Sequence, residues 1–267
     1  MRDADEQRTR ETILAKLAED PERYLEEYER RFGNVLNADN AATLFEEYEA
    51  DRARYREAVH PAATWIRDEL FRRKLREEDA QRRDTVVFTA GGNAAGKSTA
   101  LEFTGAHREA RAVLDSTFSN PEHARKLVNQ VLAAGKRVVI LYVRRPLDDA
   151  IRGMLDRAAD QGRVVTIEQM IRSDRGAAET MQSLWREFHP NPRVAMRFVQ
   201  NSSADAREAS VELAMPKGYT VNRRALHEIL DAEYRAGRIT ESVWRRIRGE
   251  GESGEPGVRG PDRETGG

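Results

Sequence analysis

The residues best suited to chemistry form a glycine-rich run, Gly91-Gly92-Asn93-Ala94-Ala95-Gly96-Lys97-Ser98, which fits the pattern G-x-x-x-x-G-K-[ST]. Glycines let backbone N–H groups wrap closely around a phosphate group, and the start of a helix directly after such a loop favours an anion. Lys97 then reaches the β- and γ-phosphates of a nucleotide, and the Ser98 hydroxyl is suited to ligate Mg²⁺. The run from Gly91 to Thr99 therefore predicts a binding site for ATP and Mg²⁺.

A phosphate-binding loop of this kind usually works with a carboxylate at the end of a neighbouring strand. Asp115 is the best candidate, because it directly follows the apolar residues 112–114. In open α/β sheets such a strand end lies at the edge where ligands bind. We therefore expect Asp115 to organise Mg²⁺ together with Ser98, or to accept a proton. The alternative is that Asp115 only caps a turn, a common place for aspartate.

Arginines are frequent between residues 144 and 175. Phosphoryl transfer builds negative charge on the moving group, and arginine neutralises such charge with a rigid set of donors. Arg152, Arg157 and Arg163 are the candidates for this role on a lid that closes over the phosphates. The alternative is that these arginines form ordinary pairs on a helix surface, since Asp149 and Arg152 are three residues apart.

Short apolar runs alternate with helical segments after residue 84. The strands are predicted at 85–90, 112–114, 137–143 and 193–199, and the helix after the phosphate loop is predicted from residue 97 to about 110. Alternation of this kind indicates a parallel sheet covered by helices on both faces. The predicted fold is therefore α/β, a P-loop NTPase or kinase-like parallel sheet flanked by helices.

Composition and the spacing of apolar residues divide the chain into four regions. Residues 1–83 are rich in Glu, Arg and Ala with aromatics at helical spacing, and they predict a helical N-terminal extension in which Pro61 starts a new helix. Residues 84–221 form the predicted kinase core, and residues 222–248 the predicted C-terminal helices, with a break at Gly237. Residues 249–267 hold seven glycines and almost no apolar residue, so we expect a disordered tail.

The composition excludes several classes of protein. The 45 Lys and Arg residues nearly balance the 46 Asp and Glu residues, which gives no general attraction to nucleic acid or membranes. The absence of cysteine excludes disulfides and thiolate zinc sites. The charged N-terminus does not fit a secretory signal, and no apolar run is long enough to span a membrane. We therefore expect a cytoplasmic protein.

Three segments taken together resemble the zeta toxin family of kinases. The run Thr89–Thr99 is similar to that family's phosphate loop, which often begins with a glycine pair. Residues 114–122 resemble its acidic-small-Thr strand end and the helix that follows. Residues 143–146, 157–158 and 162–165 resemble its arginine-bearing region. The resemblance covers about residues 84 to 201.

This resemblance implies an ATP-dependent kinase that moves the γ-phosphate of ATP to a small-molecule hydroxyl, such as that of the nucleotide sugar UDP-N-acetylglucosamine, with an antitoxin as a potential protein partner. Family toxins usually carry a further strand with a base aspartate, but here only 15 residues separate Thr99 from Asp115. The base is therefore either Asp115 or a residue elsewhere. Two alternatives stay open: a nucleotide-switched interaction module or ATPase, and a nucleic-acid end kinase, which the near-neutral charge disfavours.

Overall fold

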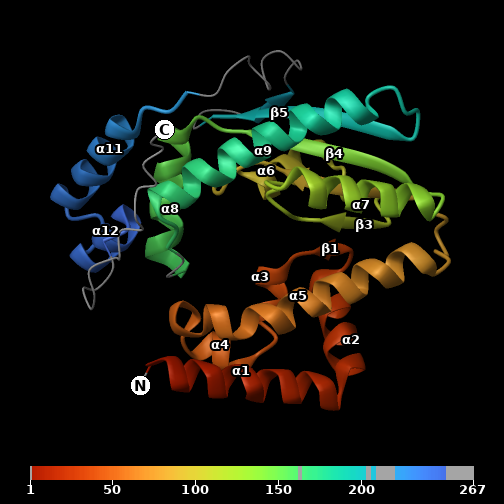
Figure 1. Ribbon diagram of the computed structural model, residues 1–267, viewed down its shortest axis with the longest axis horizontal. Coiled ribbons are helices and arrows are strands. Elements are labelled where there is room, and N and C mark those ends of the chain that lie inside the picture. The colour runs from red at the N-terminus through yellow and green to blue at the C-terminus, as the bar shows by residue number, and fades with distance from the viewer. Residues whose placement is uncertain (1, 162–163, 203–205, 209–219, 251–267) are drawn as a thin grey trace, which may run out of the picture.

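The computed structural model describes residues 2–161, 164–202, 206–208 and 220–250 as a mostly parallel sheet with helices on both faces (Figure 1). The strands are β1 (Val35–Leu36), β2 (Thr85–Ala90), β3 (Ala112–Leu114), β4 (Arg137–Arg144), β5 (Val194–Asn201) and β6 (Ala206–Glu208). The helices are α1 (Arg2–Glu19), α2 (Pro21–Phe32), α3 (Ala38–Ala42), α4 (Glu46–Ala50), α5 (Arg52–Arg76), α6 (Lys97–Thr104), α7 (Pro121–Ala133), α8 (Leu147–Gln161), α9 (Ile167–Phe188), α11 (Arg223–Arg235) and α12 (Glu241–Arg248). The described helices include none that is long and apolar enough to cross a membrane.

The described strands lie in the order β1-β3-β2-β4-β5-β6, with β6 antiparallel to β5. This arrangement confirms the predicted P-loop-type α/β fold. All four predicted strands are present, and β2 and β3 have the predicted bounds. Because β2, β3 and β4 run in parallel, the loops that follow them emerge at one edge of the sheet.

Both faces of the central strand β2 are buried, which explains its continuous apolar sequence. Val86 and Phe88 belong to the core that α5, α7 and α9 share with the N-terminal helices. Val87, between them, points to the opposite face and packs with Ala100 and Leu101 of α6. Successive side chains of β2 thus point to opposite faces of the sheet, as expected for a strand between two layers of helices.

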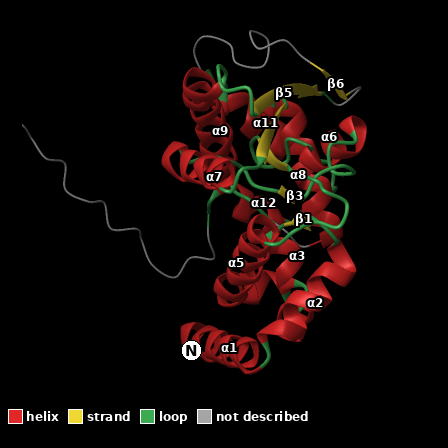
Figure 2. Cartoon of the chain, turned by 90° about the vertical axis from the view of Figure 1, so that its right-hand side faces the viewer, coloured by secondary structure: helices red, strands yellow, loops and turns green. Residues whose placement is uncertain are grey.

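The N-terminal region adds a strand that the sequence did not predict. Val35 pairs with Val113 and Leu36 with Leu114, so β1 extends the sheet beyond β3. Figure 2 shows α1 at the end farthest from the sheet, with α2, α3 and α5 between α1 and β1. One hydrophobic core runs from Ile13 in α1 to the strands. The boundary at residue 83 between extension and kinase core stays a prediction.

Helix α5 corrects one expectation. Pro61 was predicted to start a helix, but it lies inside a single helix that runs from Arg52 to Arg76. Proline removes one backbone donor from the helix and costs about 3 kcal/mol in a helix interior. Burial of one face, including Val59, Ile66 and Leu70, offsets this cost. Because the helix does not break, the residues on either side of Pro61 share one continuous surface.

The predicted end of the helix after the phosphate loop is wrong, whereas the predicted break between the C-terminal helices is confirmed. Helix α6 was expected to reach about residue 110 but ends at Thr104, where Gly105 adopts φ 63°. The predicted break at Gly237 is confirmed, since this residue separates α11 from α12 with φ 70°. Leu226 and Leu230 of α11 join the core around α8. The predicted disordered tail lies outside the described residues from 251 onward.

Candidate active site

The phosphate loop lies between the end of β2 at Ala90 and the start of α6 at Lys97. Two of its glycines are required by their surroundings. A Cβ on Gly91, which has φ 142°, would lie 2.3 Å from the carbonyl oxygen of Val143. A Cβ on Gly96, which has φ 83°, would lie 1.9 Å from Nδ2 of Asn201. The loop therefore requires glycine at these two positions, because any other residue would be strained there.

Three side chains from other elements hold the loop in place. Asn201, at the end of β5, donates from Nδ2 to the carbonyl of Ala95 at 2.9 Å and is buried. Arg145 donates from Nη1 to the carbonyl of Ala94 at 3.2 Å. Ser173 of α9 accepts from the N–H of Asn93 at 3.0 Å. These contacts bring β5, the β4–α8 connection and α9 against one loop.

Lys97 lies beside the loop and is half-buried. Its Nζ donates to the carbonyls of Gly91 at 3.4 Å and Gly92 at 3.3 Å. Ser98 and Thr99 follow in the first turn of α6 and are exposed to solvent. A lysine ammonium, a free hydroxyl and the N-terminus of a helix thus lie together, and this set of donors and ligands fits a nucleotide phosphate with Mg²⁺.

Asp115 is held by two hydrogen bonds at the end of β3. Its Oδ1 accepts from Oγ1 of Thr89, which is buried at the end of β2, at 2.6 Å. Its Oδ2 accepts from Nδ2 of Asn37 at 2.6 Å. Each carboxylate oxygen has a second lone-pair site, so the oriented carboxylate still has capacity for a metal ion or a proton. The N–H of Gly91 also donates to the carbonyl of Thr117 at 3.1 Å, which ties the phosphate loop to the Asp115 segment.

Asn37 is in turn fixed by the buried Tyr28 of α2. The Tyr28 hydroxyl accepts from the N–H of Asn37 at 2.8 Å and donates to the carbonyl of Val35 at 2.9 Å. Burial raises the pKa of Tyr28 to about 12, so the phenol stays neutral in the folded protein. Tyr28, Asn37 and Asp115 form a chain of hydrogen bonds that runs from the N-terminal helices to the edge of the sheet.

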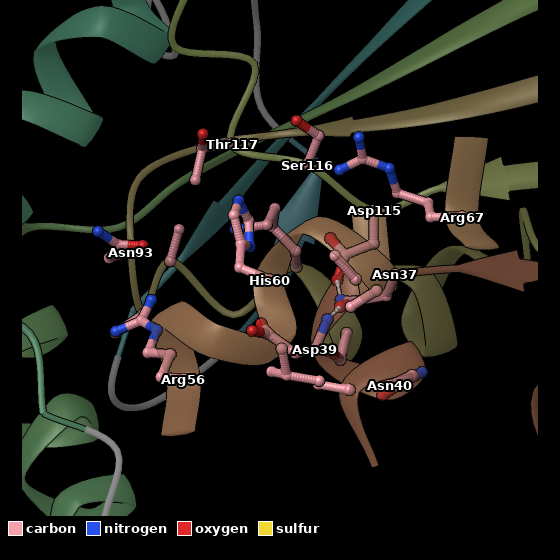
Figure 3. Close-up of a pocket in the computed structure, with 18 of the residues that line it drawn as sticks. Asn37, Asp39, Asn40, Arg56, His60, Arg67, Asn93, Asp115, Ser116 and Thr117 are labelled. Atoms are coloured by element: carbon pink, nitrogen blue, oxygen red, sulfur yellow. Dashed lines mark hydrogen bonds between the residues drawn. The ribbon is translucent and has the colours of Figure 1, made fainter. Parts of the chain in front are cut away.

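These elements enclose one cavity of about 610 Å³ (Figure 3). Residues 93–98 of the phosphate loop and residues 115–117 form one side. The N-terminal helices form the other, with side chains that sequence analysis did not assign to a site: Asn37, Asp39, Asn40, Arg56, His60 and Arg67. A volume of this size is typical of small-molecule sites. The sequence signal available for α5 was the spacing of Arg56, His60 and Arg67, which are four and seven residues apart and so share one helical face.

A comparison with family sequence profiles matches residues 106–205 to the zeta toxin family. These residues are therefore similar to the zeta toxin family, and they make up less than half of the chain. The matched region contains Asp115 and extends to β5, whereas the phosphate loop and the N-terminal helices lie before it. No curated protein matches the chain by sequence.

Solved structures resemble this chain at the level of the fold. The complex of AvrRxo1-ORF1 with ORF2 and ATP has 12% sequence identity and a TM-score of 0.50, over 80% of this chain and 66% of that chain. The native complex of the same two proteins also has 12% identity and a TM-score of 0.50, over 84% and 68%. This chain thus spans about two thirds of the length of these neighbours, and the likeness shows the fold alone.

The arginines predicted for the lid lie in or beside α8. The Arg152 side chain is 56% exposed and lies 3.9 Å from Asp149, as the helix-surface alternative expects, and it does not line the cavity. Arg157 belongs to α8, and Arg163 lies outside the described residues. The roles of all three stay predictions.

Proposed function

We propose that this chain is an ATP-dependent kinase that binds ATP at Gly91–Thr99 and transfers its γ-phosphate to a hydroxyl of a small molecule. One observation carries the proposal: Lys97 and Ser98 line the same 610 Å³ cavity as Asp115, whose carboxylate is oriented by Asn37 and Thr89. A phosphate cradle facing a fixed carboxylate across a small-molecule cavity is the arrangement that phosphoryl transfer needs.

Each residue has a distinct part in this reaction. The acceptor oxygen forms a bond to the γ-phosphorus, and the bond between that phosphorus and the bridging oxygen of ADP breaks. Lys97 and the backbone N–H groups of the loop hold the phosphates and stabilise the negative charge that develops on them. The proton of the acceptor hydroxyl passes to Asp115 or to another base. Arg152, Arg157 and Arg163 are the candidates to neutralise the transferred group.

Ser98 and Asp115 are the residues that would hold Mg²⁺, since a hydroxyl and a carboxylate oxygen suit this ion. Bound there, the ion would neutralise charge on the phosphate oxygens. Asp115 has two candidate roles, as an anchor for the ion or as the base. An Asp115→Asn protein distinguishes them, because loss of Mg²⁺-dependent ATP affinity indicates an anchor, whereas loss of transfer with unchanged affinity indicates a base.

The acceptor and the partner follow from the zeta toxin resemblance. A nucleotide sugar such as UDP-N-acetylglucosamine is the first acceptor to test. The fold neighbours are complexes with a second protein, and we extend this to a protein partner, an antitoxin, for this chain. Because ATP and nucleotide sugars are available in the cytoplasm, we propose that the chain acts there.

The decisive experiment incubates the protein with γ-labelled ATP and a panel of nucleotide sugars, nucleosides and oligonucleotides. Transfer to a small molecule is expected for the native protein and an at least hundredfold loss for Lys97→Ala. Lys136→Ala is the matched control, because Lys136 directly precedes β4 at the opposite edge of the sheet. Full transfer by Lys97→Ala contradicts the proposal. Label only on oligonucleotide ends indicates an end kinase, and ATP hydrolysis without any acceptor indicates an ATPase switch.

A further inference from the structure

One face of α5 forms the wall of the cavity opposite the phosphate loop. Arg56, His60, Ala63 and Arg67 line the cavity, and their spacing of four, three and four residues puts them in one row along the helix. In Figure 3, Arg56 extends toward Asn93, Arg67 lies near Ser116, and His60 lies between the two arginines. The row is continuous because Pro61 does not interrupt α5.

Arg56 differs from the other basic residues of α5. Seven of them lie within ion-pair distance of a carboxylate: Arg52, Arg54, Arg67, Arg72, Arg73, Lys74 and Arg76. Arg56 has no such partner among the residues that the structure describes. Among the lysines and arginines of α5, Arg56 is therefore the one without a described carboxylate partner, and it lines the cavity.

The other charged groups that line the cavity, Asp39 included, have contacts of their own. The lining contains three cationic side chains, Lys97, Arg56 and Arg67, and two carboxylates, Asp39 and Asp115. Asp115 already accepts from Asn37 and Thr89, and Lys97 belongs to the phosphate loop. Arg67 is paired with Asp68, at 2.7 Å. Arg56 therefore remains available for an anion inside the cavity, and the neighbouring His60 can add a second donor.

We propose that Arg56, assisted by His60, binds an oxyanion group of the acceptor and makes this site selective for anionic small molecules. The inference rests on the proposed kinase function, because it assigns the second substrate of the same cavity. A guanidinium binds planar carboxylate and phosphate groups through two parallel hydrogen bonds, which fixes the orientation of the molecule as well as its affinity. An acceptor held at Arg56 extends its hydroxyl across the cavity toward Asp115. Neutral sugars and nucleosides lack the group that Arg56 recognises.

The first measurement uses inorganic pyrophosphate as a probe of the second anion site. The protein is saturated with the non-hydrolysable analogue AMP-PNP and Mg²⁺, so that the phosphate loop is occupied, and pyrophosphate is titrated by calorimetry. We expect one further site, with affinity reduced about tenfold by Arg56→Ala. Arg54→Ala is the matched control, because Arg54 lies two residues away and pairs with Asp5. The inference is wrong if loaded native protein binds no pyrophosphate or if both variants bind it equally.

The second measurement separates the two substrates by steady-state kinetics. Acceptor candidates are compared in pairs with and without a phosphate or carboxylate group, and the pairs distinguish which oxyanion is preferred. Arg56→Ala is expected to raise the acceptor KM about tenfold while the KM for ATP and the kcat stay within about twofold. A rise only in the KM for ATP would assign Arg56 to the nucleotide and overturn the inference. Failure of AMP-PNP itself to bind rejects the kinase proposal instead, so the two failures are distinguishable.

Discussion

Asn37 and Asp115 are 78 residues apart in the sequence, and they meet through a 2.6 Å hydrogen bond in the lining of the cavity. Asn37 comes from the connection between β1 and α3, and Asp115 from the end of β3. Because β1 pairs with β3, the two residues emerge side by side from neighbouring strands. The N-terminal helices are thus connected directly to the carboxylate on which the proposed reaction depends.

Replacing Asn37 by serine tests this connection. Asn37 also caps α3, since its Oδ1 accepts from the N–H of Asp39 at 2.6 Å. Serine keeps the cap but is too short to reach Asp115. We expect Asn37→Ser to lower kcat about tenfold with little change in the free energy of unfolding, and Asn37→Ala to lose about 1 kcal/mol of stability as well. Unchanged kcat in both variants would mean that Asp115 needs no support from Asn37.

Gly96→Ala tests the shape of the phosphate loop. The new methyl group would collide with Nδ2 of Asn201, and alanine disfavours φ 83°. We expect the affinity for ATP, measured by calorimetry, to fall at least about a hundredfold, because the loop amides move from their positions around the phosphates. Gly135→Ala is the control, since Gly135 has φ 74° but no atom within 4 Å of an added Cβ. Equal losses of affinity in both variants would indicate general destabilisation instead.

Tyr28→Phe removes the hydroxyl that holds Asn37. We expect a loss of about 1–3 kcal/mol in the free energy of unfolding at neutral pH, because a buried N–H and a buried carbonyl lose their partner. Burial raises the pKa of Tyr28 from its ordinary value of 10.0 to about 12. This contribution to stability is therefore complete below pH 10 and is lost as the pH rises toward 12. Urea unfolding at pH 8 and pH 11 should show a smaller difference between native and variant protein at the higher pH. A difference that grows with pH contradicts the assignment.

The parts of the fold that local patterns control could be predicted from the sequence. The phosphate loop from Gly91 to Thr99 and strands β2 and β3 follow from glycine placement and short β-branched runs, which act over a few residues. Asp115 could be predicted as a site residue because the end of a strand has a fixed place at the sheet edge. The two-residue strand β1 could not be predicted, since so short a segment has no periodicity and is defined only by its pairing with β3.

The wall formed by α5 was missed for a different reason. Arg56 and His60 precede Pro61, and proline predicts the start of a new helix, so the sequence pattern places Arg67 on a different helix from them. Whether α5 faces the phosphate loop depends on where the helix packs against the sheet, and a local sequence pattern does not specify this packing. Helix propensity penalises proline, but burial of the apolar face of α5 outweighs the penalty.

Arg111→Met tests how α5 is fixed to the sheet. Arg111 precedes β3, is only 4% exposed and pairs with Asp79 at 3.1 Å. It also donates to the carbonyls of Lys74 at 2.9 Å and Glu77 at 2.8 Å, at the end of α5. Methionine has a similar length but no donors, so we expect a loss of about 3 kcal/mol in the free energy of unfolding, measured by urea titration at pH 7.

The control for this last substitution is Arg108→Met, because Arg108 lies on the same connection but is exposed. It should change stability by less than about 0.5 kcal/mol. In Arg111→Met the acceptor KM should also rise, since α5 carries Arg56 and loses its attachment near Asp79. A variant that is destabilised to the expected extent but keeps the native acceptor KM would show that the position of α5 is set by its hydrophobic contacts alone. Equal stability of the two variants would contradict the role of Arg111 itself.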